Sequence, residues 1–138
     1  MNAVVIDASA LVAWLVGDDP PTAARVEAAI ARREQAPLVA PALLRGEFAD
    51  ALSVAVRRSR LTPAQAQQAA AFADALPLEL DPQAASVGTL LLAASAHGLT
   101  AYDAIYLRLA VLRGAALPTA DRALAQAARK AGVTVQAH

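Results

Sequence analysis

Short apolar runs recur along the chain, and each is followed by a longer segment with the spacing of a helix. Runs of this length with aliphatic and β-branched residues are typical of strands that are buried on both faces of a sheet. Residues 3–6, Ala-Val-Val-Ile, are the clearest example because four apolar residues stand together without interruption. The runs that predict strands are 3–6, 38–40, 78–80, 115–118 and 133–135.

The segments between these runs begin and end at residues that favour helix boundaries. Pro41 and Pro63 suit the first turn of a helix, where the missing N–H costs nothing, and Thr22 suits a capping position. Gly98 favours the left-handed conformation that ends many helices. The predicted helices cover 9–16, 22–33, 41–59, 63–76, 83–97, 104–112 and 121–131.

Strands and helices therefore alternate through the whole chain. Such alternation predicts a mainly parallel sheet with helices on both faces. We expect an α/β fold, a three-layer α/β/α sandwich with a mainly parallel five-stranded central sheet, in a single domain over residues 1–138. A chain of 138 residues is long enough to bury such a core without disulfides or a structural metal.

Charge and composition limit the classes of function. Twelve basic residues balance twelve acidic ones, so no global basic field attracts nucleic acid, and any such contact must be local. The absence of cysteine excludes disulfides and thiolate metal sites and fits a reducing compartment. The N-terminus lacks the basic segment of a signal peptide, and no apolar run is long enough to span a membrane, so we expect a soluble, cytoplasmic protein.

Asp7 directly follows the most apolar predicted strand. In open α/β sheets the ligand crevice lies outside the carboxyl ends of the strands, which makes Asp7 a candidate for chemistry. The next residues predict a helix, so Asp7 also suits a helix cap. Taken alone, the two interpretations have about equal support.

Three further acids occupy comparable positions. Glu47 lies on the predicted helix that follows the second strand, roughly 60° from the centre of its apolar stripe, whereas Asp50 lies roughly 120° away. Asp103 opens an almost wholly apolar helix, where Thr100 and Asp103 also have the spacing of a capping box. Asp121 follows the fourth predicted strand and again suits a helix cap.

The joint placement of these acids favours a metal site. All four are expected near one crevice, and no lysine or histidine lies close to them in sequence to neutralise their charge. Clustered carboxylates raise one another's pKa unless a cation relieves the repulsion. Oxygen-only ligands suit Mg²⁺ or Mn²⁺, which activate water for attack on phosphate esters.

The same residues resemble PIN-domain proteins, and in particular the VapC toxins of toxin–antitoxin pairs. The resemblance covers the whole chain and lies in four motifs, which are Val4-Val5-Ile6-Asp7-Ala8-Ser9-Ala10-Leu11-Val12, the helix that carries Glu47, Thr100-Ala-Tyr-Asp103-Ala-Ile-Tyr-Leu, and Pro118-Thr119-Ala120-Asp121-Arg122-Ala-Leu.

The resemblance implies a five-stranded parallel sheet between helices, a homodimer, and Mg²⁺- or Mn²⁺-dependent cleavage of RNA. It implies that Asp7, Glu47, Asp103 and Asp121 are the catalytic and metal-binding acids, with Ser9 and Thr119 as supporting polar groups. It further implies an antitoxin that wraps the toxin and reaches the acidic crevice with basic or bulky side chains.

Two other functions are compatible with the same acids. One is a PIN-like scaffold with weak or no catalysis that holds a partner protein in the crevice. The other is a receiver-like phospho-acceptor domain, which ranks far lower because it needs a lysine after its last strand, and Lys130 precedes that strand.

Several residues outside the acidic motifs also carry predictions. The apolar helix around Tyr106 suggests a dimer interface, and the run from Thr89 to Ala96 suggests a buried core helix. Some arginines suggest phosphate contacts, which position RNA without reading its sequence. These are Arg45, Arg57, Arg58 and Arg60 along one helix, and Arg108, Arg113 and Arg122 near the acidic motifs.

Overall fold

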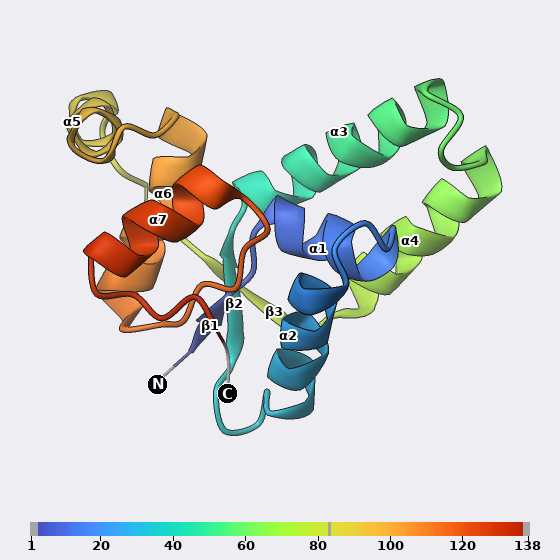
Figure 1. The fold of residues 1–138 in the computed structure, drawn as a ribbon, viewed down its shortest axis with the longest axis horizontal. Coiled ribbons are helices and arrows are strands. Elements are labelled where there is room, and N and C mark those ends of the chain that lie inside the picture. Colours follow the sequence, from blue (N-terminus) through green and yellow to red (C-terminus); the bar gives the residue numbers. More distant parts are fainter. Residues whose placement is uncertain (1–2, 83, 137–138) are drawn as a thin grey trace.

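The computed structural model describes residues 3–82 and 84–136. Its strands and helices follow one another in the order that the sequence predicts, and Figure 1 shows their arrangement. The strands are β1 (Val4–Val5), β2 (Leu38–Pro41) and β3 (Leu78–Asp81). The helices are α1 (Ala8–Leu15), α2 (Pro20–Ala31), α3 (Leu43–Arg57), α4 (Pro63–Ala75), α5 (Val87–His97), α6 (Ala101–Arg113) and α7 (Arg122–Lys130).

The three strands form a parallel sheet in the order β1-β2-β3. Val4 pairs with Leu38, and Leu38 pairs with Leu78. Every residue of β1 and β2 is buried, whereas β3 is the more exposed edge strand. Because the strands are parallel, β1 and β2 end on the same side of the sheet, and that side receives Asp7 and the start of α3.

The prediction of five strands is wrong, since the described chain forms three. Residues 115–118 nevertheless lie beside β1, and residues 133–135 lie beside 115–118. Val4 and Ala116 form an isolated parallel bridge, and the Leu117 N–H donates to the Thr134 carbonyl over 2.8 Å. The contact does not extend into a strand because Pro118 has no N–H and the flanking alanines have low strand propensity.

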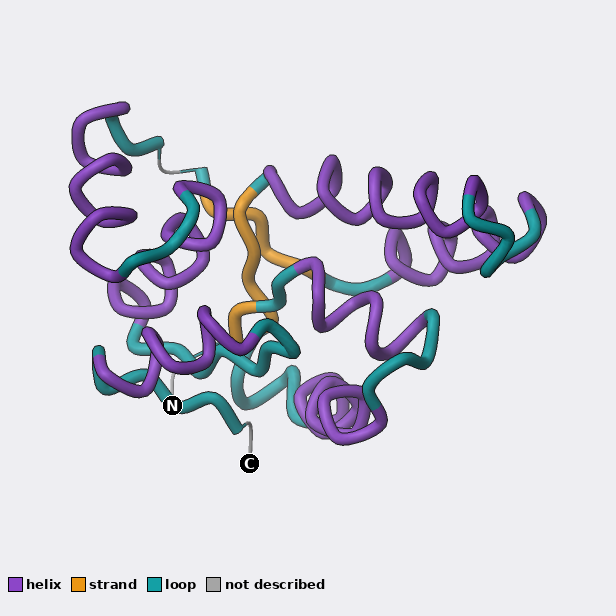
Figure 2. The backbone as a smooth tube through the Cα atoms, turned by 45° about the horizontal axis from the view of Figure 1, so that its top comes forward, coloured by secondary structure: helices purple, strands orange, loops and turns teal. Residues whose placement is uncertain are grey.

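Helices cover the sheet on both sides. Helix α6 contacts β1 and β2, and α5 and α7 pack on α6, whereas α3 packs on β2 and contacts α1 and α4 on the other side. Figures 1 and 2 show the strands running between these two groups of helices. The core between the layers is apolar and contains Ile6, Leu38, Leu107 and Leu124. No helix within the described ranges is both long enough and apolar enough to cross a membrane.

Four helix starts differ from the prediction by two residues or more. Helix α3 begins at Leu43 and not at Pro41, because Pro41 is the last residue of β2. Helix α6 begins at Ala101 with Thr100 as its cap, three residues before the predicted start. Helix α2 begins at Pro20, where the Asp19 side chain accepts from the Thr22 N–H, so the cap is Asp19 and not Thr22. Helix α5 begins at Val87 with Ser86 as its cap, four residues after the predicted start. The predicted start at Gln83 lies outside the described residues.

Two predictions about burial are also wrong. The run from Thr89 to Ala96 is not a core helix, because none of the residues in α5 is buried, and Leu91 and Leu92 are 64% and 73% exposed. Tyr106 does not lie on an outer interface, because it is only 1% exposed within the single chain. Both errors arise because an apolar helix has the same periodicity whether its partner belongs to its own chain or not.

Candidate active site

Asp7 is a buried carboxyl group at the end of β1, with 4% of its surface exposed. It caps α1, since its Oδ1 accepts from the Ala10 N–H over 2.8 Å. The Thr119 hydroxyl donates to Oδ2 over 2.6 Å, and the Ser9 hydroxyl lies 3.0 Å from both oxygens. These three donors occupy three of about four acceptor positions of a carboxylate, so one remains for a further ligand.

Burial raises the pKa of Asp7 from 3.8 to about 6. Removal of water is the largest cause, since it disfavours the charged form. The hydrogen bonds from Thr119, Ala10 and Ser9 act in the opposite direction, and the charge of Asp103 adds a further increase. Asp7 therefore loses its proton at a higher pH than an ordinary aspartate.

Ser9 and Thr119 join the beginning of the chain to its last quarter. Their hydroxyl oxygens lie 3.0 Å apart, and the Ala120 N–H donates to the Ser9 hydroxyl over 3.0 Å. The Asp121 N–H donates to the Thr119 hydroxyl over 3.1 Å. These bonds hold the segment that carries Asp121 against the start of α1, beside Asp7.

Glu47 projects from α3 toward α6. The Tyr106 hydroxyl donates to Glu47 Oε1 over 2.5 Å. The pKa of Tyr106 is raised, first by burial, then by this hydrogen bond and by the charges of Glu47, Asp7 and Asp103. Tyr106 is thus a neutral donor that orients Glu47 toward the other acids.

Asp103 lies in the first turn of α6, where the Thr100 hydroxyl accepts its N–H over 3.1 Å. Burial raises the pKa of the Asp103 carboxyl, and the negative charges of Asp121 and Glu47 raise it further, while Thr100 lowers it. Asp121 caps α7 by accepting from the Leu124 N–H over 2.9 Å. The four predicted acids are therefore electrostatic neighbours in one region of the fold.

Two of the four acids combine the predicted helix cap with a place in the acidic region. Asp7 and Asp121 cap helices and also face the acidic region, which means that capping does not exclude chemistry. The side chain in this region that was not predicted as part of the site is Tyr106, which donates to Glu47. Its signal was present, since Tyr106 lies one helical turn after Asp103 and shares its face of α6.

The donor chemistry of this site suits a hard divalent cation. All four candidate ligands are carboxylates, and the ion pairs found among the described residues, Arg60–Asp18 and Arg113–Glu79, involve none of them. Within the same residues, no three acidic or histidine side chains lie close enough together to hold one ion. The fit therefore rests on the uncompensated oxygen donors and not on a preformed coordination cage.

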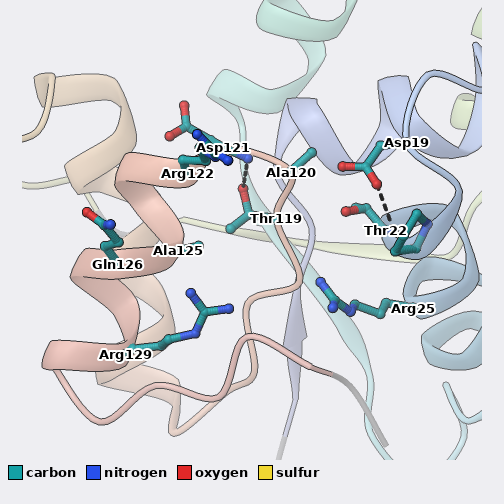
Figure 3. Close-up of a pocket in the computed structure, with 11 residues that line it drawn as sticks. Asp19, Thr22, Arg25, Thr119, Ala120, Asp121, Arg122, Ala125, Gln126 and Arg129 are labelled. Atoms are coloured by element: carbon teal, nitrogen blue, oxygen red, sulfur yellow. Dashed lines mark hydrogen bonds between the residues drawn. The ribbon is translucent and has the colours of Figure 1, made fainter.

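One side of the acidic region opens into a pocket of about 460 Å³. The segment Thr119-Ala120-Asp121 forms one wall, and Figure 3 shows the arginines that stand around it. These are Arg25 from α2 and Arg122 and Arg129 from α7. Arg122 was among the predicted phosphate contacts, whereas Arg25 and Arg129 were not identified from the sequence.

Known proteins are similar to this chain in sequence and fold. The family model described as PIN domain matches residues 4–130. The crystal structure of PAE2754 from Pyrobaculum aerophilum is similar with a TM-score of 0.69 and 28% sequence identity, over 99% of this chain and 87% of that chain. No curated protein matches the sequence at a significant level.

The family match covers all four acids and the parallel sheet that positions them. The similar crystal structure extends the likeness over nearly the whole chain. The chain belongs to the PIN-domain family, whose members are generally nucleases and typically use divalent metal ions.

Proposed function

We propose that the protein is a Mg²⁺- or Mn²⁺-dependent endoribonuclease that hydrolyses RNA phosphodiester bonds beside Asp7, Glu47, Asp103 and Asp121. The observation that carries this proposal is the mutual repulsion of these acids. The pKa values of Asp7 and Asp103 are raised by burial and by neighbouring acids, and no described cation pairs with them. A divalent cation and a phosphate bound to it would relieve that repulsion.

Asp7 and Asp103, whose charges interact, would hold the cation together with water and the substrate phosphate, and Glu47 and Asp121 lie beside Asp103. When bound, the cation would supply a water of lowered pKa and would polarise the phosphoryl oxygen. The chain's own residues orient the carboxylates. Ser9 and Thr119 fix the Asp7 oxygens, and the Tyr106 hydroxyl fixes one oxygen of Glu47.

We further propose that this nuclease is the toxin of a VapC-type toxin–antitoxin pair in the cytoplasm. The support is the resemblance of four motifs that occur in the same order and lie close together in the fold. In such a pair an antitoxin binds the toxin and blocks the acidic crevice. The proposal also includes a homodimer, which is supported by the exposed apolar side chains of α5 and α6 described below.

The test is cleavage of RNA by purified protein with Mg²⁺ or Mn²⁺, compared with the same reaction in EDTA. We expect cleavage only with the metal, and we expect Glu47→Gln to reduce it by at least about a hundredfold. Asp50→Asn is the matched control, since Asp50 lies on the same helix with an exposed side chain and should keep full activity. Calorimetry should detect Mg²⁺ binding to the unaltered protein, and weaker binding to Glu47→Gln.

The toxin role has its own test. Expression of the unaltered protein should arrest growth of the host, and expression of Asp7→Asn should not. RNA that remains intact with either metal would refute the nuclease proposal. Cleavage without growth arrest would refute only the toxin role.

A second candidate function is a PIN-like scaffold that binds a partner protein without catalysis. The exposed apolar residues of α5, such as Leu91 and Leu92, favour it because they offer a binding surface. A scaffold would take up no Mg²⁺ in calorimetry, and Asp103→Asn would leave its partner binding unchanged.

A further inference from the structure

The pocket beside the acidic region is basic at its centre. Figure 3 shows Arg25 and Arg129 on opposite walls, with their guanidinium groups pointing toward each other across the open space. Arg25 comes from the middle of α2 and is half-buried, and Arg129 comes from the last turn of α7. Two segments that are distant in sequence thus bring like charges to face each other.

The acidic residues in the pocket wall do not neutralise this pair. Asp19 and Asp121 each cap a helix, by accepting from the Thr22 N–H and the Leu124 N–H. In Figure 3 the Asp121 carboxylate points away from Arg25 and Arg129. The ion pairs among the described residues include neither arginine. Guanidinium groups that lack an ion-pair partner attract anions, and an anion in this pocket could accept hydrogen bonds from both arginines.

The pocket and the acidic region share Thr119 and Asp121. Asp121 is the one of the four acids that lines the pocket, so a strand whose scissile phosphate lay beside Asp121 would pass the mouth of this pocket. Its neighbouring phosphate is an anion with oxygens that match the planar, two-pronged donor geometry of arginine. A volume of about 460 Å³ also accommodates a phosphate with part of its sugar.

We propose that Arg25 and Arg129 bind the backbone phosphate next to the scissile one in a single-stranded RNA. This proposal rests on the proposed nuclease function, since that function places the scissile phosphate at the acids. The two arginines position the strand and take no part in bond cleavage. Binding by phosphate alone is independent of base sequence. A neutral protein can then hold RNA through one local basic pocket.

The test uses a short fluorescein-labelled single-stranded RNA and Asp103→Asn protein, which should bind RNA with strongly reduced cleavage. Anisotropy gives the Kd in Mg²⁺ over a range of KCl concentrations. Arg25→Gln and Arg129→Gln should each weaken binding by about tenfold. Each should also reduce the slope of log Kd against log salt by about 0.7, as expected for one lost phosphate contact. Arg25→Lys should recover the slope but only part of the affinity, because lysine keeps the charge and loses the planar fork.

Arg32→Gln is the matched control. Arg32 caps the C-terminal end of the same helix as Arg25, is exposed and lies outside the pocket. Its removal causes the same change in net charge and should alter the Kd by less than about twofold. Thermal melting of every variant separates a binding defect from a folding defect.

Activity gives an independent measurement. In the otherwise unaltered protein, Arg25→Gln and Arg129→Gln should raise KM and leave kcat unchanged, which is the result expected for a contact made equally in the ground and transition states. If no RNA is cut but labelled RNA still binds in an Arg25-dependent way, the phosphate pocket stands and the nuclease proposal fails. If RNA is cut and both variants match Arg32→Gln, the pocket proposal is overturned and the nuclease proposal stands.

A carboxylate-bearing protein partner is the competing occupant. Poly-L-glutamate that displaces the RNA at equal charge concentration, with the same dependence on Arg25 and Arg129, would overturn the assignment to phosphate. Failure of poly-L-glutamate to compete supports it.

Discussion

Asp7 shows how one carboxyl group serves both the fold and the site. Its hydrogen bond to the Ala10 N–H begins α1, and its bonds with Ser9 and Thr119 join that helix to the segment before α7. The same burial that makes these bonds effective disfavours the charged form of Asp7. Burial of Asp7 therefore lowers the folding stability of the metal-free protein when Asp7 is charged. Functional sites commonly reduce stability in this way.

This effect of burial predicts a dependence of stability on pH. The pKa of Asp7 rises from 3.8 to about 6 in the folded protein. Between these two pH values the folded state keeps a proton that the unfolded state loses, so stability falls as pH rises toward 6 and then levels off. The shift corresponds to about 3 kcal/mol of unfolding free energy. Burial raises the pKa of Asp103 as well, which contributes in the same direction.

The measurement is urea unfolding in EDTA at several pH values from 4 to 7. The difference between the unaltered protein and Asp7→Asn isolates the contribution of Asp7, because Asn stays neutral throughout. We expect the variant to gain relative stability as pH rises. A difference that does not change with pH would show that Asp7 titrates at an ordinary pKa.

An acid at a helix start can cap the helix, take part in the proposed nuclease activity, or do both. Asp121 accepts from the Leu124 N–H at the start of α7. Asparagine is as good a cap as aspartate, so Asp121→Asn should keep the stability of the protein, whereas Asp121→Ala should lose about 1 kcal/mol. Both variants should lose the proposed nuclease activity, because both remove the charge. Thermal melting and the RNA cleavage assay measure the two effects separately.

The matched control for that experiment is Thr62→Ala. Thr62 forms a complete capping box with Gln65 at the start of α4 and lies outside the acidic region. Its loss should cost about 1 kcal/mol and leave cleavage unchanged. Full cleavage by Asp121→Asn would show that Asp121 only caps α7.

Local signals predicted most of the elements. Thr62 and Pro63 form the predicted start of α4, and Gly98 ends α5 in the predicted left-handed conformation. The fourth and fifth strands failed as predictions because strand formation requires a continuous ladder of partners. That ladder depends on residues elsewhere in the chain, which periodicity does not report.

Most of the acidic region could be predicted from the sequence for a related reason. Asp7, Asp103 and Asp121 lie at helix starts, and the parallel order of strands brings such boundaries to one edge, while Glu47 lies in the second turn of α3. The hydrogen bond from Tyr106 to Glu47 joins α6 to α3. Arg25 of α2 and Arg129 of α7 line opposite sides of one pocket. Contacts between distant helices depend on how those helices pack, so the sequence does not show which residues meet across them, although the helix face of Tyr106 is predictable.

Across the described part of the molecule, the exposed large apolar side chains lie mostly on two neighbouring helices, α5 and α6. Helix α5 has no buried residue, and it packs on α6. The exposed large apolar residues of these helices are Val87, Leu91, Leu92, Tyr102, Val111 and Leu112. Helix α5 contains no acidic, lysine or arginine residue and yet faces solvent. Contact between its apolar side chains and water is unfavourable in an isolated chain.

A second copy of the chain would cover this surface, since a twofold interface places the same patch against itself. We therefore expect the purified protein to be a dimer by light scattering. Leu92→Glu should convert it to a monomer, because a twofold interface over this surface would then bury two like charges. Phe72→Glu is the matched control, since Phe72 is also exposed, at 53%, but lies on α4 on the opposite side of the sheet. A dimer that survives Leu92→Glu and dissociates with Phe72→Glu would place the interface on α4, and a monomer under all conditions would leave the apolar surface for a different protein.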